Sequence, residues 1–527
     1  MNLNEGLNRR SFLKGAALMG GAAAFAGMAG CAPQTPAAQE LSSTGDDFWD
    51  KETDVVIVGA GGGGLASAVE ASAAGKEVIV CEVMSGVGMS NSAICAGMIQ
   101  GACSSVQKDA GVEDTVDGFD KYLAALGEGF ENPELRRLYA EKSGETIDWL
   151  IEQGAPLTAE GLSASGTMVE YYTDVTPAVP RMHWVDGQTG AAITEPLYKK
   201  AVDQGVVFEF ETQVLKILTN ESDEVIGVRV RNGNKECSIK ARLGVILNTS
   251  GYTRNPEMIR GYMSLQIPGM SNEYPIIGSY GSPWQKGDGI LMASAVGAKL
   301  TNMWQCYNVA PGIAIKSEDN KAGLISNPGI YVSTDGKRHV NEARNNRPGG
   351  RPTENTMGEI WKQPGGFIWA IWDAAGIEKA GSFLSEGLKD EIASGDIIEA
   401  DSLEALAAVI EVDPETLKQT VEEYNANIIA GTDPLGRVEG EPLTEAPFYA
   451  AHSVGVTPDT AGGVCVNTNT QVISVFEDQI IPRLYAVGNM VGGFKGKVNA
   501  GCGQALGWTY TSGRIAGQHV VTLEPFA

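Results

Sequence analysis

The chain has 527 residues, of which 43% are hydrophobic and 67 are glycine, and its formal net charge is −26. This length allows two or more domains, each with a substantial core. A strongly acidic chain repels polyanions, so we expect no nucleic acid among its partners. The eight cysteines form no C-x-x-C pair, which excludes zinc-ribbon, c-type haem and ferredoxin-type motifs. No metal site is predicted.

The N-terminal segment predicts export. Residues 1–31 place Asn8-Arg9-Arg10-Ser11-Phe12-Leu13-Lys14 before a weakly apolar stretch of Ala, Gly and Met, which resembles a twin-arginine signal. The signal ends in Met28-Ala29-Gly30-Cys31, which resembles a lipobox with Met in place of the usual Leu, so lipidation of Cys31 stays open. Residues 32–50 are rich in Pro, Ala, Ser and Thr, a composition that is typical of a flexible linker. We expect a periplasmic or extracytoplasmic membrane-surface protein that touches the membrane only through a lipid anchor.

A strand–helix–strand pattern begins the folded part of the chain. Apolar runs at 55–58 and 78–81 predict buried strands, and residues 65–74 between them predict a helix. Three glycines fall at G-x-G-x-x-G spacing where the first strand gives way to the helix: Gly59, Gly61 and Gly64. They permit a tight turn and close approach to a pyrophosphate, which the helix N-terminus favours. Glu82, after the second run, can accept hydrogen bonds from ribose hydroxyls. The sequence predicts a Rossmann-like dinucleotide site.

The later elements predict an α/β fold with an inserted β-meander. Residues 262–400 are loosely patterned, contain five tryptophans and predict a second, α+β domain. The other expected helices and strands are helices at 133–154, 192–203, 401–431 (two helices) and 503–519, three meander strands at 207–218, 225–231 and 236–241, and buried strands at 245–247 and 484–487.

Taken in this order, these segments resemble the flavoprotein family of fumarate reductases, urocanate reductases and 3-ketosteroid dehydrogenases. The resemblance spans residues 52–520. It rests first on the segment that begins with Val58–Gly61 and continues to Glu82. The other matching stretches are Arg181–His183, Asn248–Gly251, Asp335–Arg338 with Val340–Glu342, Thr460–Gly463 and Gly488–Asn489. It implies a Rossmann-like FAD-binding domain at 51–261 and 401–527, a separate α+β capping domain at 262–400, and non-covalent FAD.

The resemblance also implies where FAD is held. Its contacts come from the glycine fingerprint and from later loops at strand ends. The expected cofactor-binding residues are Gly59, Ala60, Gly61, Gly64, Glu82, Ser90, Asn91, Ala96, Gly97, Val214, Thr249, Gly251, Asp288, Gly488, Asn489, Gly503, Ala505 and Leu506.

The chemistry that the resemblance implies is hydride transfer from reduced FAD to an activated C=C bond, with a side chain protonating the other carbon. The chain departs from the fumarate reductases at several positions, including the expected cap histidine near 308–310, which is missing from Asn308-Val309-Ala310, and two expected arginines, which are Ile325 and Asn346 here. Their arginine after Asn499 is Ala500 here, and their histidine before T-x-G-G is Asp459. Dicarboxylate binding is therefore not the expectation. The turn at 500–503 is closer to the ketosteroid enzymes, where a backbone N–H polarises a ketone.

Four residues are the catalytic candidates. Tyr172 and Tyr307 are candidates for acid or base, Arg347 for substrate binding, and Lys497 for carbonyl polarisation or carboxylate binding. Each has a plainer interpretation, because tyrosines serve packing and exposed cations offset local acidity.

Three functional hypotheses remain open at this point. The first is an exported flavoprotein reductase for a small enoate or enone, acting in anaerobic respiration. Because the chain has no haem or cluster motif, its electrons would come from a membrane cytochrome or a small flavoprotein. The second is a 3-ketosteroid-type dehydrogenase or reductase acting on a bulky enone. The third is a non-catalytic surface lipoprotein that binds FAD or another ligand.

Overall fold

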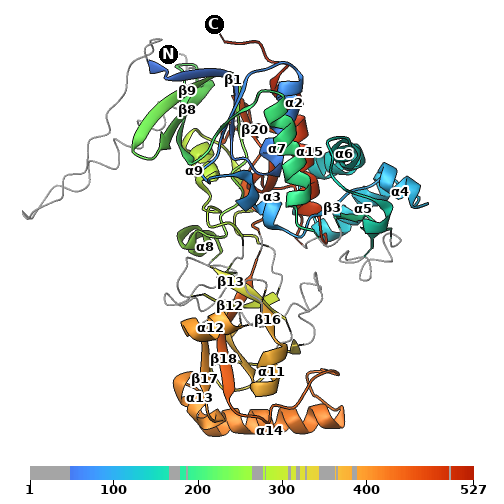
Figure 1. Cartoon of the computed structure of the whole chain (residues 1–527), viewed down its shortest axis with the longest axis vertical. Helices are drawn as coiled ribbons and strands as arrows, with labels where there is room; N and C mark the ends of the chain where they lie inside the picture. Colours follow the sequence, from blue (N-terminus) through green and yellow to red (C-terminus); the bar gives the residue numbers. More distant parts are fainter. Residues whose placement is uncertain are drawn as a thin grey trace, which may run out of the picture.

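A computed structural model gives the fold. It describes residues 48–526 except 165–178, 186–187, 264–276, 279–280, 307–309, 316–320, 327–328, 343–361, 364–365, 383–387, 458, 477 and 498–499. The expected signal, lipobox and most of the linker lie outside the described residues. Figure 1 shows two bodies, a first body built on the sheet that contains β1 and a second body built on the sheet that contains β18.

The first body is built on an eight-stranded sheet in the order β20-β21-β9-β1-β2-β6, with β8 also paired with β9 and β7 paired with β8. Its central strands run parallel, and the last four residues of β1 are buried on both faces, as expected for a covered parallel sheet. The strands are β1 (Lys51–Val58), β2 (Val78–Cys81), β6 (Val207–Glu209), β7 (Thr212–Thr219), β8 (Val225–Asn232), β9 (Lys235–Leu247), β20 (Gln471–Ile473) and β21 (Ile480–Ala486).

The β-meander joins this sheet through one long strand. The sequence predicted separate strands at 236–241 and 245–247, whereas β9 runs unbroken from Lys235 to Leu247. Its first half pairs antiparallel with β8, and residues from Ile239 onward pair parallel with β1. The meander is therefore a direct continuation of the central sheet.

Three helices pack together beside the sheet (Figure 1): α2 (Gly62–Ala73), α7 (Ala191–Asp203) and α15 (Gln504–Val520). Glycines let α2 and α15 approach closely. A Cβ at Gly513 of α15 would lie 2.3 Å from the carbonyl oxygen of Gly63 in α2. The carboxyl-terminal helix is thereby held directly against the helix that follows the glycine fingerprint.

The second body is organised around β18 (Phe448–Val456), all of whose residues are buried. This strand pairs with four others, and the sheet extends to eight strands. The other strands are β10 (Ile277–Gly278), β12 (Ala310–Ala314), β13 (Ala322–Ser326), β14 (Ile330–Val332), β15 (Ile368–Trp372), β16 (Gly381–Ser382) and β17 (Ile397–Ala400).

Residues 401–456 belong with this second sheet. Helices α13 (Leu403–Val409) and α14 (Pro414–Ala430) share a hydrophobic cluster with residues of β14, β15 and β18. The sequence prediction placed the boundary of the capping domain at 400. The pairing and packing instead assign the next 56 residues to the second body, because an amphipathic helix pattern does not reveal which sheet it covers.

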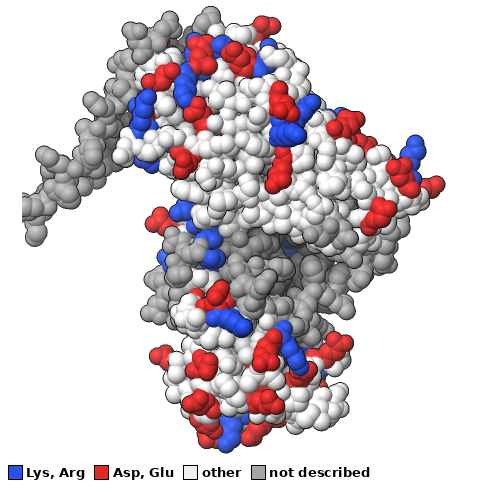
Figure 2. All heavy atoms as spheres, in the orientation of Figure 1, with Lys and Arg blue, Asp and Glu red and all other residues white. Residues whose placement is uncertain are grey.

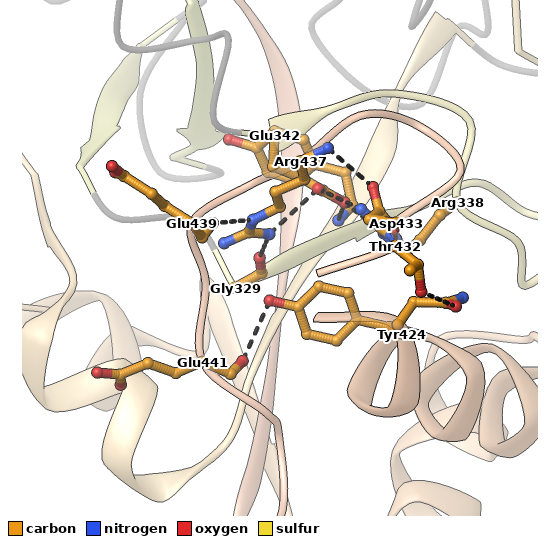
Figure 3. Close-up of polar contacts among 11 residues, drawn as sticks. Gly329, Arg338, Glu342, Tyr424, Thr432, Asp433, Arg437, Glu439 and Glu441 are labelled. Atoms are coloured by element: carbon orange, nitrogen blue, oxygen red, sulfur yellow. Dashed lines mark hydrogen bonds and ion pairs between the residues drawn. The ribbon is translucent and has the colours of Figure 1, made fainter. Parts of the chain in front are cut away.

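A buried ion network ties this body together (Figure 3). The Glu342 carboxylate, fully buried, accepts hydrogen bonds from Arg338 at 2.7 and 2.8 Å and from Arg437 at 3.1 Å. Arg338 also donates to Asp433 at 2.6 Å, and both guanidinium groups lie over the ring of Tyr424 in α14. The network fixes residues 329–342 against α14 and the loop that follows it.

The remaining elements include one long helix, α6 (Pro133–Glu152), which packs against α15 and α5 (Val116–Gly127). Among the described helices, none is both long and apolar enough to cross a membrane. Figure 2 shows acidic and basic side chains interspersed on the face drawn, with no large patch of one sign. The remaining elements are η2 (Val87–Met89), α3 (Asn91–Ile94), β3 (Met98–Gln100), α4 (Ser105–Asp109), α5 (Val116–Gly127), α6 (Pro133–Glu152), η3 (Ala159–Gly161), β4 (Leu162–Ser163), β5 (Met182–Trp184), α8 (Pro256–Met263), α9 (Asp288–Ala295), β11 (Leu300–Thr301), α11 (Ala374–Lys379), α12 (Lys389–Ser394), β19 (Gly463–Val464) and η8 (Gly488–Met490).

Candidate functional site

A groove lies at the carboxyl ends of β1, β2 and β9, where open parallel sheets bind their ligands. It is lined by the turn after β1, the end of β2, the start of β7, the loop after β9 and residues of α3, α9, η8 and α15. The lining residues are Val58, Gly59, Gly61, Cys81, Glu82, Val83, Met84, Ser90, Asn91, Ser92, Thr212, Gln213, Val214, Asn248, Thr249, Ser250, Ser282, Trp284, Gln285, Asp288, Met292, Asn489 and Thr509.

The turn after β1 requires its glycines. Gly59 has φ +100°, and a Cβ there would lie 2.4 Å from the carbonyl oxygen of Asn248. A Cβ at Gly64 would lie 2.0 Å from the carbonyl oxygen of Gly59. The first glycine therefore makes the turn, and the third brings the helix against it. Gly61 faces the groove between them.

Glu82 is held rigidly at the tip of β2. Its two carboxylate oxygens accept hydrogen bonds from the backbone N–H of Ala60 at 2.7 Å and of Met84 at 2.9 Å. Burial raises the pKa of Glu82, and these N–H donors oppose that effect. Each oxygen keeps a further lone pair, so Glu82 can accept from a diol while its position is fixed.

The facing wall is a polar cluster around Ser250. The hydroxyl of Ser250 accepts hydrogen bonds from Asn91 at 3.2 Å and from Gln285 at 3.1 Å, and Asn91 in turn accepts from the backbone N–H of Ser282 at 2.7 Å. Ser250 has φ +63°, which few residues other than glycine adopt. Such backbone strain persists where surrounding contacts fix it, and it is frequent at ligand sites.

Beyond Asn489 lies a buried ion pair. Lys495 Nζ is 2.6 Å from Asp459 Oδ2, and their side chains are 0% and 6% exposed. Asn489, which lines the groove, donates to the same carboxylate oxygen at 3.0 Å. The pair is thus linked to the groove by one hydrogen bond.

Residues 54–506 match the model of the family described as FAD binding domain. The chain belongs to this family. It is 31% identical to the digoxin reductase of Eggerthella lenta over 99% of this chain and 98% of that protein. Two solved structures are also similar. One is the open conformation of a flavocytochrome c3 fumarate reductase, with TM-score 0.72, 28% identity and coverage of 90% of this chain and 79% of that one. The other is the 3-ketosteroid-delta4-(5alpha)-dehydrogenase from Rhodococcus jostii RHA1, with TM-score 0.62, 26% identity and coverage of 91% and 99%.

The cofactor is FAD, and the chain is an FAD-dependent oxidoreductase acting on C=C bonds. The expected family, fold class and enzyme class are confirmed. The groove suits FAD, because its glycines leave room for a pyrophosphate and Glu82 is placed to accept from a ribose. Among the described residues, no group of three or more His, Cys, Asp or Glu could hold a metal ion.

The structure brings nine of the expected cofactor residues together in the groove: Gly59, Gly61, Glu82, Ser90, Asn91, Val214, Thr249, Asp288 and Asn489. Ala60 and Gly64 support the turn from behind, and Gly251 packs against the hydroxyl of Thr460. Gly488, with φ +69°, donates its N–H to Ser512 at 3.0 Å. Five others lie outside the lining: Ala96, Gly97, Gly503, Ala505 and Leu506.

Sequence reasoning missed a second set of lining residues. Ser92 accepts the N–H of Gly62 at 3.0 Å, and Asn248 donates from Nδ2 to the carbonyl oxygen of Gly59 at 3.3 Å. Ser92 directly follows the expected contact Asn91, and Asn248 directly follows the strand predicted at 245–247. A polar side chain at each of these two positions was the signal that the sequence offered. Trp284 and Gln285 come from the connection to the second body, and Thr509 comes from the second turn of α15; no motif marks them.

Of the four catalytic candidates, three lie outside the described residues: Tyr172, Tyr307 and Arg347. The fourth, Lys497, lies at the surface. It pairs with Glu128 at 2.7 Å, both side chains are about two-fifths exposed, and it is not part of the groove lining. The structure therefore does not bring Lys497 together with the FAD site.

Proposed function

We propose that this protein is an exported reductase that transfers a hydride from FAD to one carbon of an activated C=C bond in a small organic acceptor. The observation that carries the proposal is the FAD groove of a chain that resembles a digoxin reductase and a fumarate reductase over nine-tenths or more of its length. When bound, FAD supplies the hydride. The protein holds the ribose at Glu82, seats the cofactor over the glycine turn, and provides the proton for the second carbon.

The electron donor is a separate protein in this proposal, either a membrane cytochrome or a small flavoprotein. The given sequence has no C-x-x-C-H motif and no iron–sulfur cluster motif. It therefore offers no haem or cluster that could pass electrons to the FAD within this chain. The export signal at residues 8–14 and the lipobox-like Met28–Cys31 support an extracytoplasmic location. Together they suit a reductase that uses an organic terminal acceptor in anaerobic respiration.

The proton donor is proposed to be Tyr172 or Tyr307, with Arg347 binding the acceptor. The support is their position in the sequence relative to the family. Tyr172→Phe should abolish turnover while FAD stays bound, because only the hydroxyl is removed. Undiminished turnover by this variant would eliminate Tyr172, and the same test would then apply to Tyr307→Phe.

An anaerobic reoxidation assay tests the proposed function. The purified flavoprotein is reduced and mixed in turn with fumarate, urocanate, aryl acrylates and 3-ketosteroids, and flavin absorbance is followed. We expect rapid reoxidation by at least one enoate or enone and no reoxidation by the matching saturated compounds. Reoxidation by none of the four classes would overturn the proposal.

A second candidate is a 3-ketosteroid-type enzyme, which the glycine-rich turn at 500–503 favours. Ala500 is buried and uncharged, and its carbonyl oxygen accepts hydrogen bonds from Tyr122 at 2.6 Å and Gln100 at 2.8 Å. The turn is therefore held firmly with no cation at this position, which suits a neutral enone better than a dicarboxylate. Reoxidation by ketosteroids alone would select this candidate.

A further inference from the structure

Trp284 is a large aromatic side chain that lines the FAD groove and is nevertheless 41% exposed. Its segment, residues 281–287, follows β10 of the second sheet and precedes α9. Among the described residues that line the groove, Trp284 alone carries an aromatic ring. The exposed ring therefore belongs to a wall that a bound ligand contacts.

The backbone on both sides of Trp284 is fixed to the walls of the groove. The N–H of Ser282 donates to the side chain of Asn91 at 2.7 Å, and Gln285 donates from Nε2 to the hydroxyl of Ser250 at 3.1 Å. Both Ser282 and Gln285 are buried. The hydroxyl of Ser282 also accepts the N–H of Trp284 at 3.4 Å. The indole thus extends from an anchored stretch of backbone, which keeps its place at the rim of the groove.

A series of contacts connects Trp284 to the end of the groove that suits adenosine. The hydroxyl of Ser282 donates to Met84 Sδ at 3.8 Å, and the backbone N–H of Met84 donates to the carboxylate of Glu82 at 2.9 Å. An acid at the position of Glu82 accepts from the ribose of the adenosine half of a dinucleotide. The segment that carries Trp284 is therefore attached beside this ribose site.

The ammonium group of Lys286 lies on one side of the Trp284 ring, with Nζ 5.9 Å from the ring centroid. A cation in this position is attracted to the π face of the indole. It occupies that face, so a flat ring can stack only on the opposite one. Adenine is such a ring, and every nucleobase has a π face that stacks on aromatic side chains.

We propose that Trp284 stacks on the adenine ring of FAD and covers the adenosine end of the groove. Its exposed indole becomes buried when the cofactor binds, and stacking of this kind strengthens binding about tenfold to a hundredfold. Trp284 is then a cofactor-binding residue that the glycine fingerprint does not reveal. The inference rests on FAD as the cofactor and not on the proposed acceptor, so it is independent of the outcome of the reoxidation assay.

The test compares the full-length holoprotein with its variants Trp284→Phe and Trp284→Leu. The readout is the rate of FAD release, followed by the rise in flavin fluorescence. Phenylalanine keeps a flat ring, whereas leucine keeps only apolar bulk. The leucine variant should release FAD about tenfold to a hundredfold faster than the parent, and the phenylalanine variant should stay much closer to the parent.

The matched control is Tyr262→Leu. Tyr262 is an aromatic residue of α8 with a similar exposed fraction, 37%, and it is not part of the groove lining. This variant should release FAD at the parental rate. Parental release by Trp284→Leu would overturn the proposal, and so would equal acceleration by Trp284→Phe and Trp284→Leu, because the flat ring would then make no difference.

A second probe, ADP, identifies the half of the cofactor that the ring contacts. ADP carries the adenine, ribose and diphosphate of FAD without the flavin. In the full-length protein freed of flavin, Trp284→Leu should weaken ADP binding, measured by calorimetry, by about the same factor as FAD binding. Weaker FAD binding with unchanged ADP affinity would place the ring on the flavin half and overturn the proposal.

Urea denaturation of the flavin-free proteins separates binding from folding. Because the Trp284 ring is exposed at the rim, Trp284→Leu should unfold at the same midpoint as the parent. A clearly lower midpoint would mean that the ring serves the fold, and it would overturn the proposal even if FAD were released faster.

Discussion

Glu82 and Ala60 are joined by a 2.7 Å hydrogen bond from the backbone N–H of Ala60 to the carboxylate of Glu82. The bond connects the tip of β2 to the turn after β1, so Glu82, the proposed ribose-binding acid, and the glycine fingerprint form one rigid unit. Because the second carboxylate oxygen is held by Met84, Glu82 has little freedom to move. The FAD site is thus organised before the cofactor binds, which lowers the entropy cost of binding.

Glu82→Gln should weaken FAD binding about tenfold to a hundredfold, because charge-assisted hydrogen bonds to ribose hydroxyls become neutral and one oxygen becomes an NH₂ group. FAD affinity of the reconstituted protein, measured by flavin fluorescence, checks this. Glu209→Gln is the control, since Glu209 ends the neighbouring strand β6, pairs with Lys51 and is not part of the groove lining. Equal FAD affinities for the two variants would contradict the role of Glu82.

Gly513→Ala should destabilise the first body, because the new methyl group would lie 2.3 Å from the carbonyl oxygen of Gly63 and force α15 away from α2. Overpacking of this kind costs about 1–3 kcal/mol or more. The control is Gly261→Ala in α8, where a Cβ meets nothing within 4 Å and alanine favours the helix. Urea denaturation should show a lower midpoint for the first variant and an unchanged or higher one for the second. A neutral Gly513→Ala would contradict the close packing of α2 and α15.

The parts of the fold that follow from local rules could be predicted from the sequence. The strand at 78–81 was predicted with its observed bounds, and the glycines at 59 and 64 lie in the close approaches that their spacing indicates. The positive φ of Gly59 and the contact of Gly64 with Gly59 are local features of the turn between β1 and α2, so the pattern alone carries the information.

The parts that depend on long-range packing could not be predicted. Lys495 and Lys497 are two positions apart, and the catalytic hypothesis chose Lys497, yet Lys495 is fully buried beside Asp459 and Lys497 lies at the surface. Both lysines lie in an irregular segment, where apolar and polar residues do not alternate with a regular period. The sequence therefore does not show which of the two side chains is buried. The helices at 401–431 were found, but their place in the second body depends on packing against β14, β15 and β18, which the helix pattern does not show.

Glu342→Gln should destabilise the second body by about 3–5 kcal/mol, because it leaves the buried guanidinium groups of Arg338 and Arg437 without their shared counter-ion. Figure 3 shows both groups directed at this carboxylate. The control is Glu404→Gln, which removes an exposed pair with Lys418 at 3.7 Å and should cost less than about 1 kcal/mol. Thermal unfolding of both variants measures the difference. Similar losses for the two would show that the buried network adds no stability beyond that of a surface pair.

His183 should make the protein less stable as pH falls from about 6.5 to about 4. Its Nε2 lies 2.7 Å from Ser104 Oγ and its Nδ1 lies 3.0 Å from the carbonyl oxygen of Arg181, which suits a neutral ring, and burial lowers its pKa to about 4. The unfolded state therefore binds more protons in this window, so stability decreases on acidification, by up to about 3 kcal/mol. In His183→Gln this contribution is absent, and the slope of urea-unfolding free energy against pH should be shallower than in the parent. His339→Gln, which replaces an exposed histidine beside Asp335, serves as the control. A parent-like slope in His183→Gln would mean that other groups govern the acid response.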